Sequence, residues 1–194
     1  VWGYAKYHHP VFCDTLCRVD VDSALFVLLP RVVHADRETR NRHLLDWVRS
    51  LGDYTPNRVE CEQSLAPLEL VSTVDLAWTR DTTLLGRDLS RLLQDLRYAE
   101  RGENYYLRMG TTGNGPGYHY LSLRGESFHP TPQMDSGLNL LTLFRLWNII
   151  EYYAPYRAVT LHPWEEVLST YIPLMGVETD GRRFARLYMR LIRE

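Results

Sequence analysis

The sequence is poor in cysteine, has a single lysine and contains no long apolar run. Its three cysteines, Cys13, Cys17 and Cys61, are an odd count in a chain of 194 residues, which argues against a disulfide framework. The most apolar segment, 138–153, is interrupted by charged and amide side chains, so no stretch reaches the length that a bilayer span needs. A net charge of -2 and a pI near 6.4 exclude the basic footprint expected for nucleic-acid binding.

Two aromatic segments that lie far apart in the chain are built to the same plan. VWGYAKYHHP opens the sequence, and LWNIIEYYAP occupies 146–155. The matching positions are Trp2 with Trp147, Tyr7 with Tyr152 and Pro10 with Pro155, each offset by 147 minus 2, or 145. Self-similarity of this kind indicates that one helical unit is used twice.

The similarity continues beyond the aromatic segments. ALFVLLP at 24–30 matches VLSTYIP at 167–173 with an offset of 143, and each is followed by a third amphipathic segment, at 36–51 and 179–194. The register of the third pair is ambiguous by one residue. The alternative is that any two aromatic helices that end at proline look alike, because proline commonly stops a helix. Three elements that agree in order and spacing favour the repeat.

Apolar periodicity predicts a mainly α fold with one central β-hairpin. Capping residues place the expected helix starts at Asp22 or Ser23, at Asp36, at Thr83 and at Asp135 or Ser136, with Pro163 opening a further helix. Two related three-helix units should flank the middle helix and the hairpin. We expect the first unit over 1–53, a linker, helix and hairpin over 54–134, and the second unit over 135–194, with one compact domain as the alternative.

The hairpin is predicted from two β-prone runs, at 105–107 and 118–123, separated by the glycine-rich segment GTTGNGPG. Four glycines in that segment suggest a phosphate cradle. However, no G-K-[ST] follows and no helix opens directly after it, so a hairpin tip is the favoured interpretation.

Histidines and cysteines near the start of the chain could form a metal site. His8, His9, Cys13 and Cys17 lie close together, and imidazole and thiolate are the ligands that zinc prefers. Their spacing does not match a zinc knuckle, and the second copy replaces both histidines with Tyr153 and Ala154. We therefore expect these side chains to serve packing or to lie at the surface, and we expect no metal or cofactor.

Three segments together resemble the region that precedes the catalytic domain in tail-specific, or carboxy-terminal processing, serine peptidases. They are DLAWTRDTTLLGRDLSRLLQDLRYAERGENYY, then LLTLFRLWNIIEYYAPYRAVTLHPWEEVLSTYIP, then the closing helix. The likeness is closest to envelope-associated bacterial members and covers nearly the whole chain. Its most specific part is the block from Trp147 to Tyr153 with Pro155, Trp164, Leu168 and Pro173.

The resemblance implies that this chain is the non-catalytic part of a serine endopeptidase, located in the periplasm or cell envelope. Its implied partners are a catalytic domain of the same polypeptide beyond Glu194 and a protein or peptide substrate. No catalytic residue of the family maps onto this sequence. A serine–lysine dyad needs an unprotonated lysine near a serine, and only Lys6 is available. Lys6 is expected to be a surface cation whose stem lies over aromatic rings.

A second hypothesis needs no peptidase. The chain could be a freestanding helical module that binds a protein or peptide through an exposed patch of tryptophan and tyrosine. Both hypotheses predict that this segment alone is inactive. They differ in what the gene encodes after Glu194.

Overall fold

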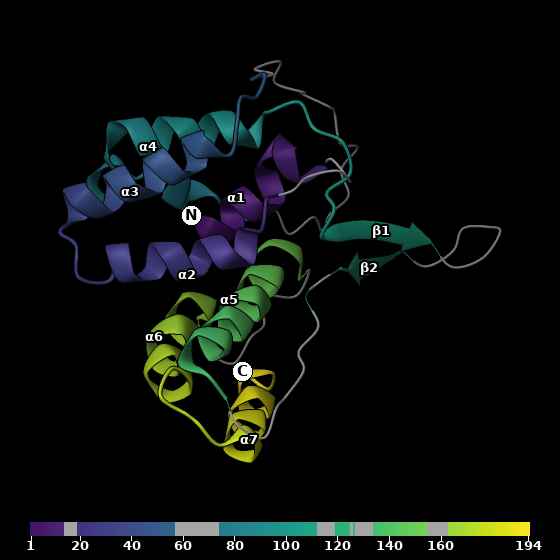
Figure 1. Ribbon diagram of the computed structural model, residues 1–194. Coiled ribbons are helices and arrows are strands. Elements are labelled where there is room, and N and C mark those ends of the chain that lie inside the picture. The colour runs from purple at the N-terminus through teal and green to yellow at the C-terminus, as the bar shows by residue number, and fades with distance from the viewer. Residues whose placement is uncertain (14–18, 57–73, 112–118, 125, 127–133, 155–162) are drawn as a thin grey trace. The chain divides into compact units, whose positions relative to one another are not determined.

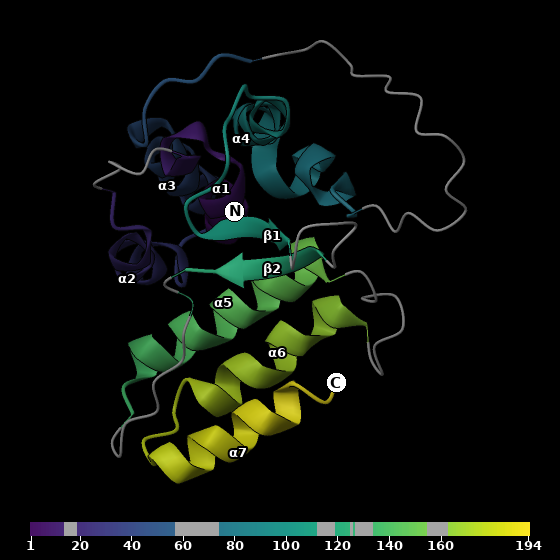
Figure 2. The same cartoon turned by 90° about the vertical axis from the view of Figure 1, so that its right-hand side faces the viewer.

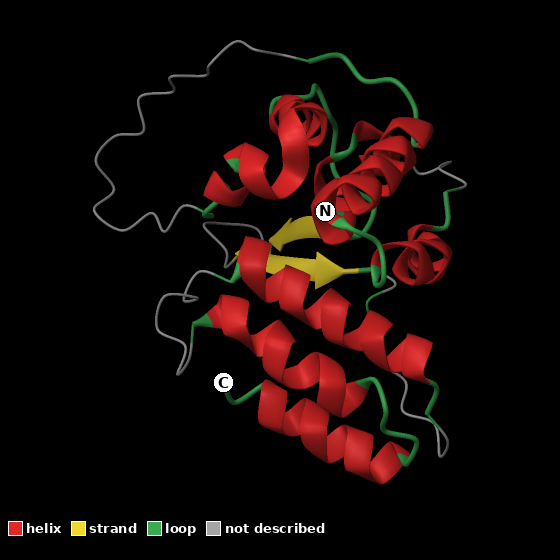
Figure 3. Ribbon diagram, turned by 90° about the vertical axis from the view of Figure 1, so that its left-hand side faces the viewer, coloured by secondary structure: helices red, strands yellow, loops and turns green. Residues whose placement is uncertain are grey.

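The fold is mainly helical with one β-hairpin, as predicted. It is seen in a computed structural model that describes all residues except 14–18, 57–73, 112–118, 125, 127–133 and 155–162. Within the described residues there are seven α-helices, shown in red in Figure 3, and one antiparallel pair of strands in yellow.

The described residues form two compact units. The first comprises those of Val1–Pro67 and Asp75–Ser127, and the second those of Leu68–Val74 and Phe128–Glu194. Helix α4 and the hairpin, which the sequence placed in a middle region over 54–134, belong to the first unit.

Four helices and the hairpin make up the first unit. The helices are α1 (Trp2–His8), α2 (Val21–Val32), α3 (Arg37–Ser50) and α4 (Thr82–Arg97). Short 3₁₀ turns follow α1 at Pro10–Cys13 and precede α4 at Ala77–Arg80. Helix α3 lies along α4 (Figure 1), and α4 buries its leucine stripe as its periodicity predicts.

Two helix starts in the first unit differ from the sequence prediction. The Asp20 carboxylate accepts from the amides of Asp22 and Ser23, so α2 begins one residue after Asp20. Helix α4 is capped by Asp81, and it is broken inside by Gly86, whose φ of 71° lies in the left-handed region that glycine tolerates best.

The hairpin pairs β1 (Leu107–Thr111) with β2 (His119–Leu123), with Leu107 opposite Leu123. The first strand therefore begins two residues later than predicted. Gly110 faces Tyr120, whose ring occupies the space that any Cβ at position 110 would need. The expected tip of the hairpin falls mostly at 112–118, outside the described residues.

The second unit consists of α5 (Ser136–Tyr153), α6 (Trp164–Met175) and α7 (Gly181–Leu191), which Figure 2 shows side by side. Leu143, Trp164, Tyr171 and Phe184 belong to its core. Asn148 and Glu151 of α5 are buried although their side chains are polar. The amide of Asn148 donates to the carbonyl of Phe144 one turn earlier, which satisfies a polar group inside the unit.

Equivalent residues of the two units make the same hydrogen bonds. The Trp2 indole donates to the carbonyl of Val21, the first residue of α2, over 2.7 Å. The Trp147 indole donates to the carbonyl of Trp164, the first residue of α6, over 2.9 Å. Val21 and Trp164 are 143 positions apart (164 minus 21), which is the offset of the second matching segment. Both hydrogen bonds therefore connect equivalent positions of the repeat.

Helix lengths and caps follow the repeat as well. Helices α2 and α6 each have 12 residues, and each contains a proline, Pro30 or Pro173, nine positions after its first residue. Asp36 caps α3 and Asp180 caps α7, and in both cases the carboxylate accepts from the amide three residues later. The caps favour an offset of 180 minus 36, or 144, for the third pair.

Candidate functional site

Lys6 is fully buried in the first unit, which corrects its expected position at the surface. Its Nζ lies 5.2, 5.8 and 4.4 Å from the ring centroids of Trp2, Tyr7 and Tyr106. Attraction between a cation and an aromatic ring is worth on the order of 2 kcal/mol when both are removed from water. The expected contact with aromatic rings is thus present, but it encloses the ammonium and not only the stem.

Two carboxylates complete this cage, which we call the Lys6 cage. Asp22 Oδ1 lies 3.6 Å from Lys6 Nζ, and Glu126 forms a closer ion pair with the same atom. Burying an unpaired charge costs several kcal/mol, so these acids explain why Lys6 is found inside the protein. Asp22 is in the first turn of α2 and Glu126 follows β2, so one side chain joins α1 to two other segments.

The Lys6 cage is arranged for packing and not for nucleophilic catalysis. Carboxylates stabilise the charged ammonium, whereas a general base needs the free amine beside a hydroxyl. The side chains around Nζ include three aromatic rings and two carboxylates. The cage therefore gives no support to a serine–lysine dyad at Lys6.

His8 lies against the ring of Tyr4, with ring centroids 4.0 Å apart and the planes nearly parallel. Its Nδ1 is 2.9 Å from the carbonyl oxygen of Tyr4. Burial, with a smaller contribution from Arg101, lowers the pKa of His8 to about 4. At neutral pH the ring is uncharged and packs as an aromatic group.

His9 is buried beside the rings of Phe12 and Tyr54. Its Nδ1 accepts from the Val11 amide over 3.2 Å, and burial lowers the pKa of His9 as well. Cys13 is half-buried, and Cys17 lies outside the described residues. Among the residues that can be described, no three histidine, cysteine or acidic side chains are arranged to hold a metal ion.

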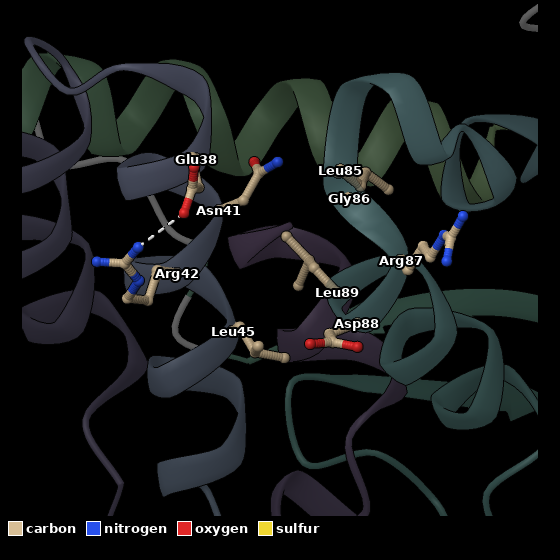
Figure 4. Close-up of a pocket in the computed structure, with 9 residues that line it drawn as sticks. All are labelled: Glu38, Asn41, Arg42, Leu45, Leu85, Gly86, Arg87, Asp88 and Leu89. Atoms are coloured by element: carbon tan, nitrogen blue, oxygen red, sulfur yellow. Dashed lines mark hydrogen bonds and ion pairs between the residues drawn. The ribbon is translucent and has the colours of Figure 1, made fainter.

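A pocket of about 450 Å³ lies between α3 and α4 (Figure 4). Asn41 and Leu45 of α3 line one side of it, and Leu85 and Leu89 of α4 line the other. The main-chain break at Gly86 leaves the Leu84 carbonyl free of the helix, and Asn41 Nδ2 donates to it over 2.9 Å. The pocket thus marks the seam where α4 covers α3.

A second pocket, of about 580 Å³, continues along the same two helices. Its charged lining carries both signs, with Arg49 and Arg91 beside Asp53, Asp88 and Asp95. Tyr54 also lines it, and burial, together with the charge of Asp95, raises the pKa of that phenol. Because the two arginines offset most of the charge of the three aspartates, this pocket does not strongly favour a ligand of one charge.

A third hollow, which we call the α6–α7 groove, lies in the second unit and has a volume of about 490 Å³. Its apolar lining is Pro173, Leu174, Val177 and Leu187, and its charged lining is Glu178, Arg183, Arg186 and Arg190. Unlike the other two pockets, it combines an apolar floor with an excess of one charge.

Sequence reasoning missed both the Lys6 cage and the α6–α7 groove. Asp22 and Glu126 are separated from Lys6 by 16 and 120 positions (22 minus 6, and 126 minus 6), so no local motif connects them. A single lysine between aromatic residues was the available signal for the cage. For the groove, the signal was three arginines, at 183, 186 and 190, on one face of the last helix.

No protein-family model, curated protein or solved structure matches this chain. None of the helices in the described residues is both long enough and apolar enough to cross a membrane.

Proposed function

We propose that this chain is the non-catalytic helical region of a serine endopeptidase similar to the tail-specific family. Its role is to pack against the catalytic domain of the same polypeptide, where it shapes access to the cleft or supports assembly. In this role the periplasm or cell envelope is the expected compartment. The catalytic serine and lysine would lie in the partner domain and not in this chain.

The observation that supports this proposal is an uncovered apolar face on α7. Met189 and Ile192 are 54% and 51% exposed. With the offset of 144 given by the caps, they are equivalent to Leu45 and Val48 of α3. Leu45 lines the seam with α4, and Val48 is only 1% exposed.

The two third helices therefore differ in how they are covered. Helix α3 packs against both α2 and α4, whereas among the described elements α6 is the one that packs closely on α7. Exposed apolar side chains on one face of a helix are typical of a surface that packs against another domain. We assign this face, formed by Ala185, Met189 and Ile192, to the catalytic domain.

The proposal is tested with the gene and with the full-length protein. The reading frame should continue past Glu194 into a domain that contains a separated serine and lysine, and a stop codon a few positions later would refute it. In the full-length protein, hydrogen exchange at residues 184–194 should be slower than in the 194-residue chain. Substituting Met189 and Ile192 with aspartate should abolish that difference, whereas unchanged protection would contradict the assigned face.

The alternative, a freestanding binding module, is not favoured by the tryptophans. Trp2 and Trp164 are buried, and Trp47, Trp78 and Trp147 are half-buried, so none of the five forms an exposed anchor. A different observation does favour peptide binding as a second activity of the same chain, and it concerns the α6–α7 groove.

A further inference from the structure

We propose that the α6–α7 groove binds an acidic peptide segment that inserts an apolar side chain between two carboxylates. This binding site lies on a different face of α7 from the face formed by Ala185, Met189 and Ile192. The proposal does not depend on the peptidase assignment. The apolar floor of the groove and its charged rim support this proposal. The equivalent positions of the first unit carry different residues.

The floor of the groove exposes apolar side chains at the end of α6. Leu174 is 42% exposed and Val177 is 75% exposed, and Pro173 and Leu187 continue the same surface. Apolar groups gathered in a hollow with polar surroundings are a common signature of a binding surface. A volume of about 490 Å³ is sufficient for a few side chains of a ligand.

The rim is basic because α7 places Arg183, Arg186 and Arg190 along one face. In the described part of the chain, no carboxylate forms an ion pair with Arg183 or Arg186, so both guanidinium groups are available to a ligand. Guanidinium groups bind carboxylates through paired hydrogen bonds, which favours glutamate or aspartate in the ligand. Among the described residues that line the groove, Glu178 is the one acid beside three arginines, which gives the site an excess of positive charge.

One end of the groove is held in place by the core. The Tyr171 hydroxyl donates to Glu194 over 2.6 Å, and Arg190 lies close enough to influence the same phenol. Arg190 at this end and Arg183 and Arg186 toward the start of α7 define a line of positive charge. An extended peptide can follow that line with alternate side chains directed at the floor.

The first unit has no such surface at the equivalent positions. Where the groove has Leu174 and Val177, the offset of 143 leads to Arg31 and His34. With the offset of 144, Leu187 and Arg190 correspond to His43 and Asp46. The first unit therefore lacks the apolar floor and the excess of positive charge at these equivalent positions.

A peptide suits the groove better than other anionic ligands do. Leu174, Val177 and Leu187 need an apolar side chain against them, which a nucleic-acid backbone does not supply. The net charge of -2 also means that the chain as a whole has no basic excess to attract a polyanion.

The test is fluorescence anisotropy on the 194-residue chain with a fluorescein-labelled peptide of sequence Glu-Glu-Leu-Glu-Glu-Phe. We expect binding that weakens with added salt. The double substitution R183E and R186E should weaken it at least about tenfold, because it reverses both unpaired charges. The matched control is R182E with R193E, which reverses two arginines outside the groove and should change affinity by less than about twofold.

Two further arms make the result decisive. L174S with V177S leaves every charge in place and should still weaken binding at least about fivefold, because it removes the floor. Circular dichroism checks that each variant is folded. The proposal is overturned if the wild-type chain does not bind the peptide, if both arginine pairs matter equally, or if the glutamine version of the peptide binds as well. Stronger binding to single-stranded DNA or to phosphatidylglycerol vesicles would also overturn it.

Discussion

The two units share their framework but differ in the chemical groups that they carry at equivalent positions. The tryptophan hydrogen bonds, the lengths of α2 and α6, and the aspartate caps of α3 and α7 correspond. By contrast, the offset of 145 aligns Lys6 with Glu151 and aligns His8 and His9 with Tyr153 and Ala154. The two copies of the repeat thus share a few hydrogen bonds between side chains and the backbone. Their buried charged and titratable side chains differ.

The largest expected effect comes from the Lys6 cage, which has no cationic equivalent in the second unit. Lys6→Met leaves Asp22 and Glu126 without their cation and should lower the free energy of unfolding of the first unit by about 3–5 kcal/mol. Hydrogen exchange of α1 and α2 amides at increasing urea concentration measures this loss. The second unit should be unaffected because each unit has its own core.

A double substitution shows whether the loss comes from the ion pair. Lys6→Met combined with Glu126→Gln should cost clearly less than the sum of the two single changes, because the second change removes a charge that the first left unpaired. Arg42→Met is the control, since it breaks the exposed pair with Glu38 and should cost almost nothing. A small loss for Lys6→Met, similar to that control, would show that the cage contributes little.

The helical framework was predictable because its signals are local. The apolar periodicity of 83–96 and the caps at Asp36 and Asp135 need only a few neighbouring residues, and all three agree with the structure. The repeat was also visible, since Trp2 and Trp147 keep their spacing to the following helix.

The sites were not predictable, because they depend on residues that only the fold brings together. Lys6 looked like a surface cation until Glu126, after the hairpin, was found beside it. Asn148 and Glu151 are polar but buried, and helical periodicity shows which residues share a face but not what covers that face. Gly86 gave no sign of the break in α4, since a lone glycine is tolerated inside a helix.

The next largest effect is a pH dependence of the stability of the first unit, which we attribute to His8. Burial lowers the folded-state pKa of His8 from 6.5 to about 4, so the unfolded chain takes up the proton first. The stabilisation from neutral His8 is therefore complete above pH 6.5 and is lost as the pH falls toward 4. The loss should be on the order of 3 kcal/mol in the first unit.

His8→Tyr tests this by giving the first unit the residue that the second has at Tyr153. We expect the free energy of unfolding of the first unit, measured by hydrogen exchange at increasing urea concentration, to depend less on pH between 6.5 and 4 in this variant. Some dependence should remain because burial also lowers the pKa of His9. An unchanged pH profile for the first unit would mean that His8 is not the titrating group.

A moderate and similar effect is expected from the two tryptophan hydrogen bonds. Trp2→Phe and Trp147→Phe each remove one indole hydrogen bond to the first residue of the following helix, which should cost about 1 kcal/mol in the corresponding unit. The measurement is the free energy of unfolding of each unit by hydrogen exchange. A large cost in one unit and none in the other would argue that the bonds are not equivalent.

The smallest effect is expected at the caps of the third helices, where the two units should behave alike. Asp36→Ala and Asp180→Ala each remove one carboxylate that accepts a backbone amide, and each should lower the Tm by a few degrees. Those hydrogen bonds lower the pKa of both carboxyls, so their contribution is present above the unfolded-state pKa of 3.8 and is lost as the pH falls through the lower folded-state value. Thermal unfolding at neutral pH and at pH 2 checks both points, because the difference between wild type and variant should shrink in acid. If α7 frays because its Met189 face is uncovered, Asp180→Ala will shift Tm less than Asp36→Ala, since a cap stabilises only a helix whose end is held in place.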